Sequence, residues 1–286
     1  MKNKLPWIGL FLITILWGFV NILYRFIESA NYFSVAFFLL LFSSIIAFAI
    51  LIFSKKLKEL RPLKKIKLII IIGIVNSATW FLVYFAVTNT SIAQAVLGFI
   101  TPPIFVAILS PFVLKENINR KILFALIMAL IGIILIFNPE SLVKSMASFG
   151  IISGIFVGLC SSADRIVGRL LKNDYSPQSL AFLGSFMGLL LMTPVFIFSN
   201  PIIPNEISLA IILIISAAGI MGGIAIYYSL RHIIAQKVSI ILLLEPLISI
   251  IAAFLIFLEI PSPLTIVGGA LLIIANIIII KNQSDV

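Results

Sequence analysis

The sequence is poor in charged residues, which make up only 10% of its 286 positions, against about 25% in ordinary soluble domains. Hydrophobic residues make up 62%. A chain this apolar is not an ordinary water-soluble domain, nor is it disordered, because disorder requires low hydrophobicity and high net charge. Lipid is therefore the expected surrounding of most of the molecule.

Cysteine and histidine are almost absent as well. Cys160 is the single cysteine and His232 the single histidine. One cysteine cannot form an internal disulfide, and one histidine cannot supply a two-histidine metal site. No nucleotide-binding loop of the form G-x-x-x-x-G-K-[ST] is present. We therefore expect no metal and no cofactor, and ATP hydrolysis by this chain alone is excluded.

Long apolar runs are what the sequence has in abundance. Charges, prolines, glycines or Asn/Ser clusters delimit ten of them, at 6–24, 33–53, 67–88, 92–114, 120–138, 149–171, 177–198, 207–230, 235–258 and 263–280. A spanning helix needs about 20 apolar residues, and in lipid its backbone groups must bond within their own segment. The runs are too long and too continuous for barrel strands. The predicted fold class is an all-α membrane protein with ten transmembrane helices, the first of which is retained.

Basic residues are distributed unevenly between the predicted connections. If the N-terminus is cytoplasmic, 18 of the 20 lysines and arginines lie on the cytoplasmic side, and only Arg25 and Lys144 lie outside. An excess of this kind in short loops sets orientation. We expect both termini to be cytoplasmic, in a multi-pass protein of the cell (cytoplasmic) membrane. The net charge of +10 then reflects topology, so nucleic acid is not an expected partner.

The sequence also repeats itself at an offset of 143 residues. At that offset four pairs coincide: Asn21 with Asp164, Tyr84 with Tyr227, Pro103 with Pro246, and Glu116 with Glu259. These pairs predict two five-helix units, 1–140 and 141–286. Because five is odd, the second unit lies upside down relative to the first. Inverted repeats are typical of secondary transporters whose binding site lies near the midplane.

The residues that repeat also resemble a known family. Each half ends with an aromatic-rich span, Ile-Ala-Gln, a mid-span proline and a glutamate: Tyr84, Gln94, Pro103 and Glu116, then Tyr227, Gln236, Pro246 and Glu259. With Trp17-Gly18 before Asn21, and Leu244-Glu245-Pro246, the chain resembles the ten-helix EamA branch of the drug/metabolite transporter superfamily from about 5 to 280. The resemblance implies a basket-like bundle around a central cavity lined by spans one, three, four, six, eight and nine, with spans five and ten peripheral.

Glu245 lies near the centre of the ninth predicted span. A carboxyl group facing lipid there is disfavoured by several kcal/mol, so the side chain should face the bundle interior or a water-filled cavity. It is the first candidate for proton coupling or for recognition of a substrate cation. The alternative is a structural carboxyl group that ties spans together.

Asp164 is the second candidate, in the sixth predicted span. Arg165 and Arg169 follow one and five positions later, and neither spacing places them on its face of a helix. A partner for Asp164 must therefore come from another helix or from the substrate. An ion pair that only anchors the helix end is the alternative to a role in binding or gating.

Polar and aromatic residues recur at helical spacing on the first, third and fourth predicted spans. Lipid gives no reason for such stripes, so they should point inward. The predicted substrate-binding set is Trp17, Asn21, Trp80, Tyr84, Thr101, Asp164, Tyr227 and Glu245. The alternative is that the polar residues join helices and that the tryptophans belong to interfacial belts.

Prolines within two predicted spans indicate kinks. Pro102 and Pro103 in the fourth span, and Pro246 in the ninth, remove a backbone donor and clash with the preceding turn. We expect these positions to act as hinges, because the freed carbonyl groups can meet substrate or water in a cavity.

Together these features predict a secondary active transporter and not an enzyme. It would export or exchange a small amphipathic metabolite, with amino acids or related compounds first and with proton coupling as an option. It would be a monomer or a weak homodimer in the lipid bilayer. A non-transporting membrane subunit and an intramembrane enzyme are the alternatives. The enzyme would need a catalytic cluster that a lone His232, Cys160 and Asp164 do not make.

Overall fold

The computed structural model describes residues 4–28, 30–61, 63–89, 101–136, 149–257 and 262–281. Within these ranges all regular structure is helical, which confirms the predicted all-α class. The elements are α1 (Leu5–Val20), η1 (Asn21–Phe26), α2 (Tyr32–Phe53), η2 (Leu57–Leu60), α3 (Ile66–Asn89), α5 (Pro102–Val113), α6 (Arg120–Ile136), α8 (Phe149–Leu170), α9 (Pro177–Phe198), α10 (Glu206–His232), α11 (Ala235–Ile241), α12 (Leu244–Phe257) and α13 (Pro263–Lys281).

Six of the described helices are long and apolar enough to cross a membrane. They are Leu5–Tyr24, Tyr32–Phe53, Ile66–Ala86, Pro177–Phe198, Glu206–His232 and Pro263–Lys281. The bundle also presents bulky apolar side chains outward: Phe53, Phe112 and Phe198 are each at least 81% exposed. An outward apolar surface of this kind suits lipid and not water.

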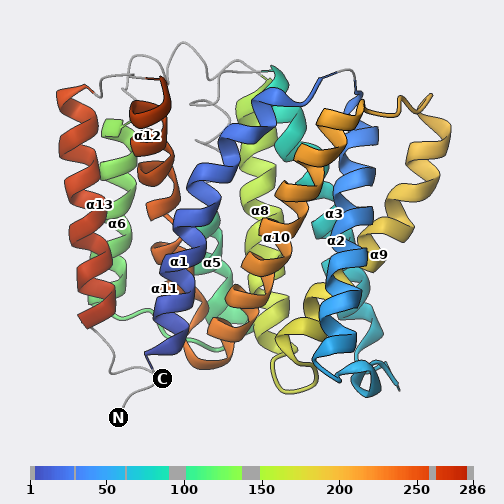
Figure 1. The fold of residues 1–286 in the computed structure, drawn as a ribbon. Coiled ribbons are helices and arrows are strands. Elements are labelled where there is room, and N and C mark those ends of the chain that lie inside the picture. The colour runs from blue at the N-terminus through green and yellow to red at the C-terminus, as the bar shows by residue number, and fades with distance from the viewer. Residues whose placement is uncertain are drawn as a thin grey trace.

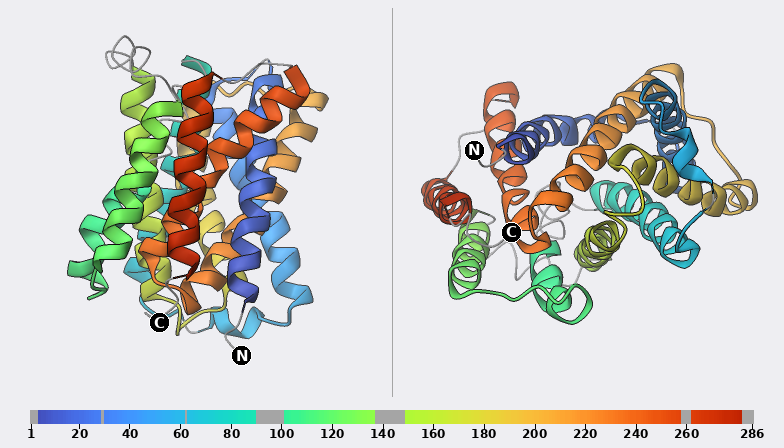
Figure 2. Two further views of the ribbon diagram at one scale, coloured as in Figure 1. Left: turned by 90° about the vertical axis from the view of Figure 1, so that its left-hand side faces the viewer. Right: turned by 90° about the horizontal axis from the view of Figure 1, so that it is seen from below.

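The helices form an elongated bundle in which α1 begins and α13 ends at the same end, the lower end in Figure 1. There, the Ser229 hydroxyl near the end of α10 donates to the carbonyl group of Pro6 at 3.0 Å. The helices α6 and α13 pack against each other at one edge of the bundle, while α2, α3 and α9 pack together at the other, and α8 lies between, against α3 and α5 (Figures 1 and 2). The peripheral place of α6 and α13 is the one that the resemblance implies for spans five and ten.

Two of the predicted spans are interrupted, the first where the sequence analysis expects continuous helix and the ninth just before Pro246, where it expects a kink. The first becomes a 3-10 helix at Asn21. The ninth is divided at Leu242 and Leu243 into α11 and α12, so the break precedes Pro246 by three residues. The N–H of Glu245 bonds the Leu242 carbonyl at 3.1 Å and so satisfies it across the break. Interruptions of this kind within the membrane are usual where helices line a cavity.

Pro102 and Pro103 begin α5, where a missing N–H leaves no bond unmade. The expected kink and hinge at these prolines involve the preceding turn and stay predictions. The remainder of that predicted span, 92–100, lies outside the described residues, as do Gln94 and Glu259 of the repeated motif.

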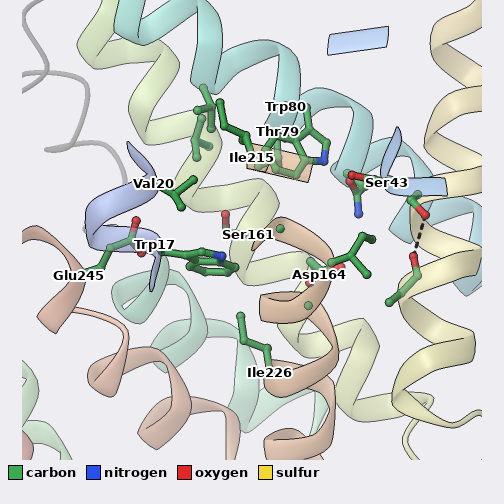
Figure 3. Close-up of a pocket in the computed structure, with 18 of the residues that line it drawn as sticks. Trp17, Val20, Ser43, Thr79, Trp80, Ser161, Asp164, Ile215, Ile226 and Glu245 are labelled. Atoms are coloured by element: carbon green, nitrogen blue, oxygen red, sulfur yellow. Dashed lines mark hydrogen bonds between the residues drawn. The ribbon is translucent and has the colours of Figure 1, made fainter. Parts of the chain in front are cut away.

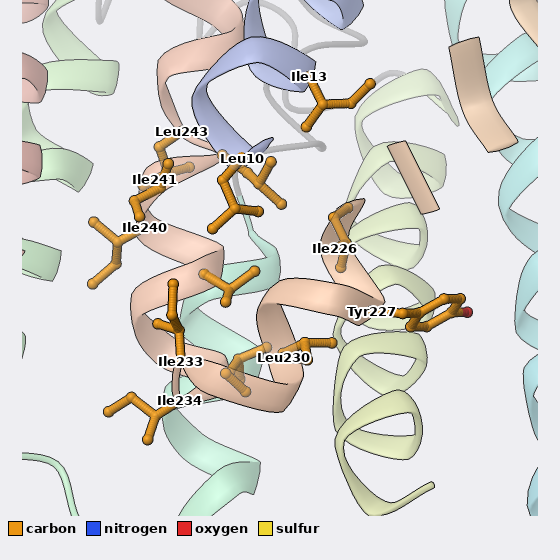
Figure 4. Close-up of a cluster of buried hydrophobic side chains, with 14 of the residues drawn as sticks. Leu10, Ile13, Ile226, Tyr227, Leu230, Ile233, Ile234, Ile240, Ile241 and Leu243 are labelled. Atoms are coloured by element: carbon orange, nitrogen blue, oxygen red, sulfur yellow. The ribbon is translucent and has the colours of Figure 1, made fainter. Parts of the chain in front are cut away.

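Buried aliphatic side chains fill the lower part of the bundle (Figure 4). Leu10 of α1 and Leu230 of α10 are fully buried, and Ile233 and Ile240 around the α10–α11 junction are at most 3% exposed. They belong to one continuous apolar cluster that α1, α5, α10 and α11 share. We call Leu10, Leu230, Ile233 and Ile240 the floor, because they fill the space between these helices in the lower part of the bundle.

Candidate functional site

A cavity of about 220 Å³ lies inside the bundle next to the floor. Residues of α1, η1, α3, α5, α8, α10 and α12 line it, and α2 and α9 add Ser43, Ala181 and Ser185. The last two helices were not among those that the resemblance implies. The lining is mixed, with the indole rings of Trp17 and Trp80 beside carboxyl groups (Figure 3).

Glu245 enters this cavity from the first turn of α12. Its Oε1 accepts a hydrogen bond from Nδ2 of Asn21 at 2.7 Å. Asn21 lies where α1 becomes η1, and Glu245 lies just beyond the break between α11 and α12. A helix N-terminus stabilises negative charge, so the first turn of α12 is a favourable place for a carboxylate. The hydrogen bond therefore joins two helix interruptions from opposite halves of the chain.

Asp164 lines the same cavity from α8. Its Oδ1 accepts a hydrogen bond of 2.6 Å from the phenolic hydroxyl of Tyr227, on α10. The partner of Asp164 does come from another helix, as expected. The sequence analysis placed Tyr227 in the site but did not pair it with Asp164. In Figure 3, Trp17 lies between Glu245 and Asp164, so the two carboxyl groups are on different sides of the cavity.

The two tryptophans owe their positions to glycines on α10. A Cβ atom at Gly219 would lie 2.9 Å from the Trp80 ring, and one at Gly222 would collide with Trp17. The Trp17 Nε1 donates to the carbonyl group of Ala218 at 3.0 Å. Because its only polar group is used in this way, Trp17 presents its ring rather than its N–H to the cavity.

Arg165 is a lining residue that the sequence analysis missed. Arg165 is 8% exposed, and its Nη1 donates to the hydroxyl group of Ser239 on α11 at 3.0 Å. The sequence analysis asked only whether Arg165 faces Asp164 along one helix. A cavity admits neighbours from a wide arc of the same helix, and the apolar sequence around Arg165 on α8 was the available signal.

Tyr84 and Thr101 are not among the described residues that line the cavity. Tyr84 is 3% exposed and packs against the rings of Tyr24 and Tyr32, with centroid distances of 6.5 and 6.1 Å. Thr101 is the residue before α5. The periodic spacing of Tyr84 identified the inward side of α3, but neighbouring helices, and not the cavity, fill the space beside its ring.

A polar network crosses the lower end of the bundle, beyond the floor. We call it the Glu116 network; its members are Ser110, Glu116, Arg169, Leu230, Ala235 and Gln236. Glu116 accepts from Arg169 Nε at 2.9 Å and from the backbone N–H of Ala235 at 3.1 Å. Arg169 also donates to the carbonyl group of Leu230. These bonds connect the end of α5 with α8, α10 and α11.

Apolar helices around a polar, carboxylate-bearing cavity are the features of a polytopic membrane protein with a site for a small molecule. The model of the EamA-like transporter family matches residues 5–138 and again residues 148–281. The chain therefore belongs to the EamA-like transporter family. It is a transporter and not an enzyme, and a multi-pass protein of the cytoplasmic membrane, as the sequence analysis expected.

Individual relatives are distant in sequence. The chain is similar to an S-adenosylmethionine uptake transporter of Rickettsia conorii, with 25% identity over 99% of this chain and 95% of that protein. It is 24% identical to an uncharacterized transporter of Clostridium kluyveri over 71% of this chain and 68% of that one. One solved crystal structure superposes with a TM-score of 0.76 over 98% of this chain and 99% of that chain, at 15% identity. That likeness shows a shared fold.

Proposed function

We propose that the protein is a secondary transporter that works by alternating access, with Glu245 as the group that couples transport to protons or binds a cationic part of the solute. The observation that carries this proposal is the hydrogen bond of 2.7 Å between Asn21 and Glu245. It lies in the cavity, it joins the two halves of the chain, and both partners lie at helix interruptions. A solute or a proton that competes for Glu245 would loosen one half from the other.

The proposed architecture is ten spans in two inverted five-helix units, with both termini in the cytoplasm. The two successive family matches, 5–138 and 148–281, support two units with the boundaries expected near residue 140. The beginning of α1 and the end of α13 at one end of the bundle support an even number of crossings. The described hinge candidate Pro246 lies in the first turn of α12, one residue from Glu245.

The proposed substrate is a small amphipathic metabolite, an amino acid or a related compound. Indole rings supply an apolar wall, and carboxyl groups supply partners for a cationic group. The relative from Rickettsia conorii is named for S-adenosylmethionine, which joins an aromatic base to a cationic amino-acid moiety. Because that relative is named for uptake, we propose exchange, which moves solute in both directions, rather than export alone.

The test is counterflow with the purified protein in proteoliposomes, screened over amino acids, amines and S-adenosylmethionine. The expected result is transient accumulation of labelled solute against an unlabelled internal pool. Glu245→Gln should lower the initial rate about 10-fold or more and flatten its pH dependence, since the amide cannot ionise. Glu206→Gln is the matched control, because Glu206 is exposed at the start of α10. Absence of flux with every solute would favour a non-transporting subunit, and an unchanged pH profile in Glu245→Gln would refute the role of Glu245.

A further inference from the structure

The cavity contains one positive charge that the proposed function does not use. Arg165 lines the cavity and is 8% exposed. A guanidinium group has five N–H donors, and among the described residues the hydroxyl group of Ser239 is its one hydrogen-bond acceptor. Neither Asp164 nor Glu245 forms a salt bridge with it in the described part of the chain.

Each carboxyl group of the cavity is instead held by a neutral partner. Asp164 accepts from the hydroxyl group of Tyr227, and Glu245 accepts from the amide of Asn21. A buried charge without an oppositely charged contact is costly, so it persists where it has a function. The cavity therefore holds cation-binding and anion-binding groups that do not neutralise each other by contact.

We propose that Arg165 binds the carboxylate of an α-amino acid, while Asp164 beside it binds the α-ammonium group. This inference rests on the proposed function and deepens it by naming the substrate class. The two groups fit such a solute because both line the same cavity from α8, so one bound solute can reach both. An α-amino acid carries its opposite charges on two groups that are bonded to the same carbon atom. The planar guanidinium group matches a carboxylate with two parallel hydrogen bonds.

The rest of the solute then lies against the aromatic wall. Trp17 and Trp80 bring indole rings to the same cavity, so a large apolar or aromatic side chain is favoured over a small one. Glu245, on the other side of Trp17 in Figure 3, is left for a second cation or for a proton. The alternative role for Arg165 is purely structural, as a positive charge that offsets two nearby carboxylates.

A series of solutes that differ only at the carboxylate separates these roles. L-phenylalanine, L-phenylalaninamide and phenethylamine compete with the labelled solute in the counterflow assay, as do S-adenosylmethionine and its decarboxylated analogue. In the wild-type protein each acid should compete about 10-fold or more better than its partner without a carboxylate. In Arg165→Gln that preference should disappear, because the acids compete more weakly while their partners without a carboxylate compete as before. Arg165→Lys, which keeps the charge but not the paired geometry, should retain part of it.

The control is Lys67→Gln, which removes one positive charge at an exposed position near the start of α3. It should keep the wild-type preference. If the role of Arg165 is structural, every solute in the series should compete more weakly in Arg165→Gln than in the wild-type protein, and the preference for the acids should remain. That result would overturn the inference. If Arg165→Gln does not fold, indifference of the wild-type protein to the carboxylate is enough to overturn it. The protein could also transport some other solute while no acid in the series competes for it. That result would refute the inference and leave the proposed function standing.

Discussion

Gly223 is a position in the cavity wall with empty space beside it. It lines the cavity from α10, and a Cβ atom there would meet nothing within 4 Å. Its neighbour Gly222 is different, since a Cβ atom there would collide with the ring of Trp17. One glycine therefore leaves room for the solute, and the other makes room for an indole ring that belongs to the wall.

Gly223→Leu should abolish transport without unfolding the protein, because the new side chain occupies space that a solute needs. We expect an initial rate in the counterflow assay that is about 10-fold lower or more, and a thermal stability close to that of the wild-type protein. Gly222→Ala should do the opposite and destabilise the protein by about 1–3 kcal/mol, the usual cost of overpacking. Detergent-solubilised samples of both variants are compared by thermal unfolding. Wild-type rates in Gly223→Leu would show that solute does not pass this point.

Glu59 is a residue whose charge contributes to stability outside the membrane. Its Oε2 accepts from the Ser176 backbone N–H and from the Ser179 hydroxyl, both at 2.8 Å, at the start of α9. Lys56 Nζ lies 3.1 Å from Oε1. Partial burial acts to raise the pKa of Glu59, but these hydrogen bonds outweigh it and lower the pKa from 4.5 to about 2. The ionised carboxylate therefore holds the loop between α2 and α3 to the first turn of α9.

The lowered pKa predicts a pH-dependent effect of Glu59→Gln. A carboxyl group with a lowered folded-state pKa stabilises the fold above its unfolded pKa of about 4.5, and this contribution is lost as the pH falls toward 2. The variant should unfold about 2 °C or more below wild type at pH 7, and the gap should narrow at pH 3. Thermal unfolding at the two pH values measures it, with Glu206→Gln as control. An equal gap at both values would contradict the assigned cause.

Single residues of the site were predictable where lipid makes them costly. Glu245 and Asp164 stand out in the sequence because a carboxyl group in an apolar run needs an explanation, and Asn21 was found by its spacing from Trp17. Their partners were not predictable, since the hydrogen bonds Asn21–Glu245 and Asp164–Tyr227 cross between helices. Tyr84 shows the opposite limit, because helical spacing gives the inward direction but not whether a ring or a cavity lies there.

Helix positions were predictable to within a few residues. Of the two interruptions, Pro246 indicated the one in the ninth span, whereas nothing in the sequence indicated the 3-10 segment at Asn21. The runs 33–53 and 177–198 correspond to α2 and α9 almost to the residue. Pro246 has no N–H to donate to the Leu242 carbonyl one turn earlier, and the break between α11 and α12 lies at Leu242 and Leu243. The break places Glu245 in the first turn of a new helix.

We expect the Glu116 network to keep the lower end of the bundle closed. Its ion pair is largely buried, since the side chains of Arg169 and Glu116 are 12% and 10% exposed. Their hydrogen bonds reach the end of α5, α8 and the α10–α11 junction, the elements around the floor. An alternating-access transporter must separate these elements when it opens at this end, so the network should resist that opening.

Glu116→Gln should therefore favour the state that is open at the lower end. In a Cys160→Ser background, Ile233→Cys tests the floor, where Ile233 is 3% exposed. Adding Glu116→Gln should raise the rate at which a water-soluble maleimide modifies Ile233→Cys about 10-fold, because a neutral amide no longer pairs with Arg169. Glu206→Gln should leave the rate unchanged. Equal rates with and without Glu116→Gln would show that the network does not control the floor.

At the scale of the whole molecule, two halves of one chain enclose a single cavity. Residues from α1, η1, α2, α3 and α5 line one part of it, and residues from α8, α9, α10 and α12 line the other. The matched positions Asn21 and Asp164, which the offset of 143 residues brings together, both line the cavity. The matched pair does not have matched partners, since Asn21 bonds a carboxylate and Asp164 a phenol.

The most direct test of alternating access is the accessibility of Ser161, a cavity residue on α8, from each side of the membrane. Ser161→Cys in a Cys160→Ser background is treated with a membrane-impermeant maleimide on one side at a time, while Lys58→Cys serves to identify the cytoplasmic side. The account predicts that Ser161→Cys is modified from either side during exchange, that solute slows both reactions, and that Lys58→Cys reacts only from the cytoplasm. Modification of Ser161→Cys from one side alone during exchange, or from neither, would contradict it.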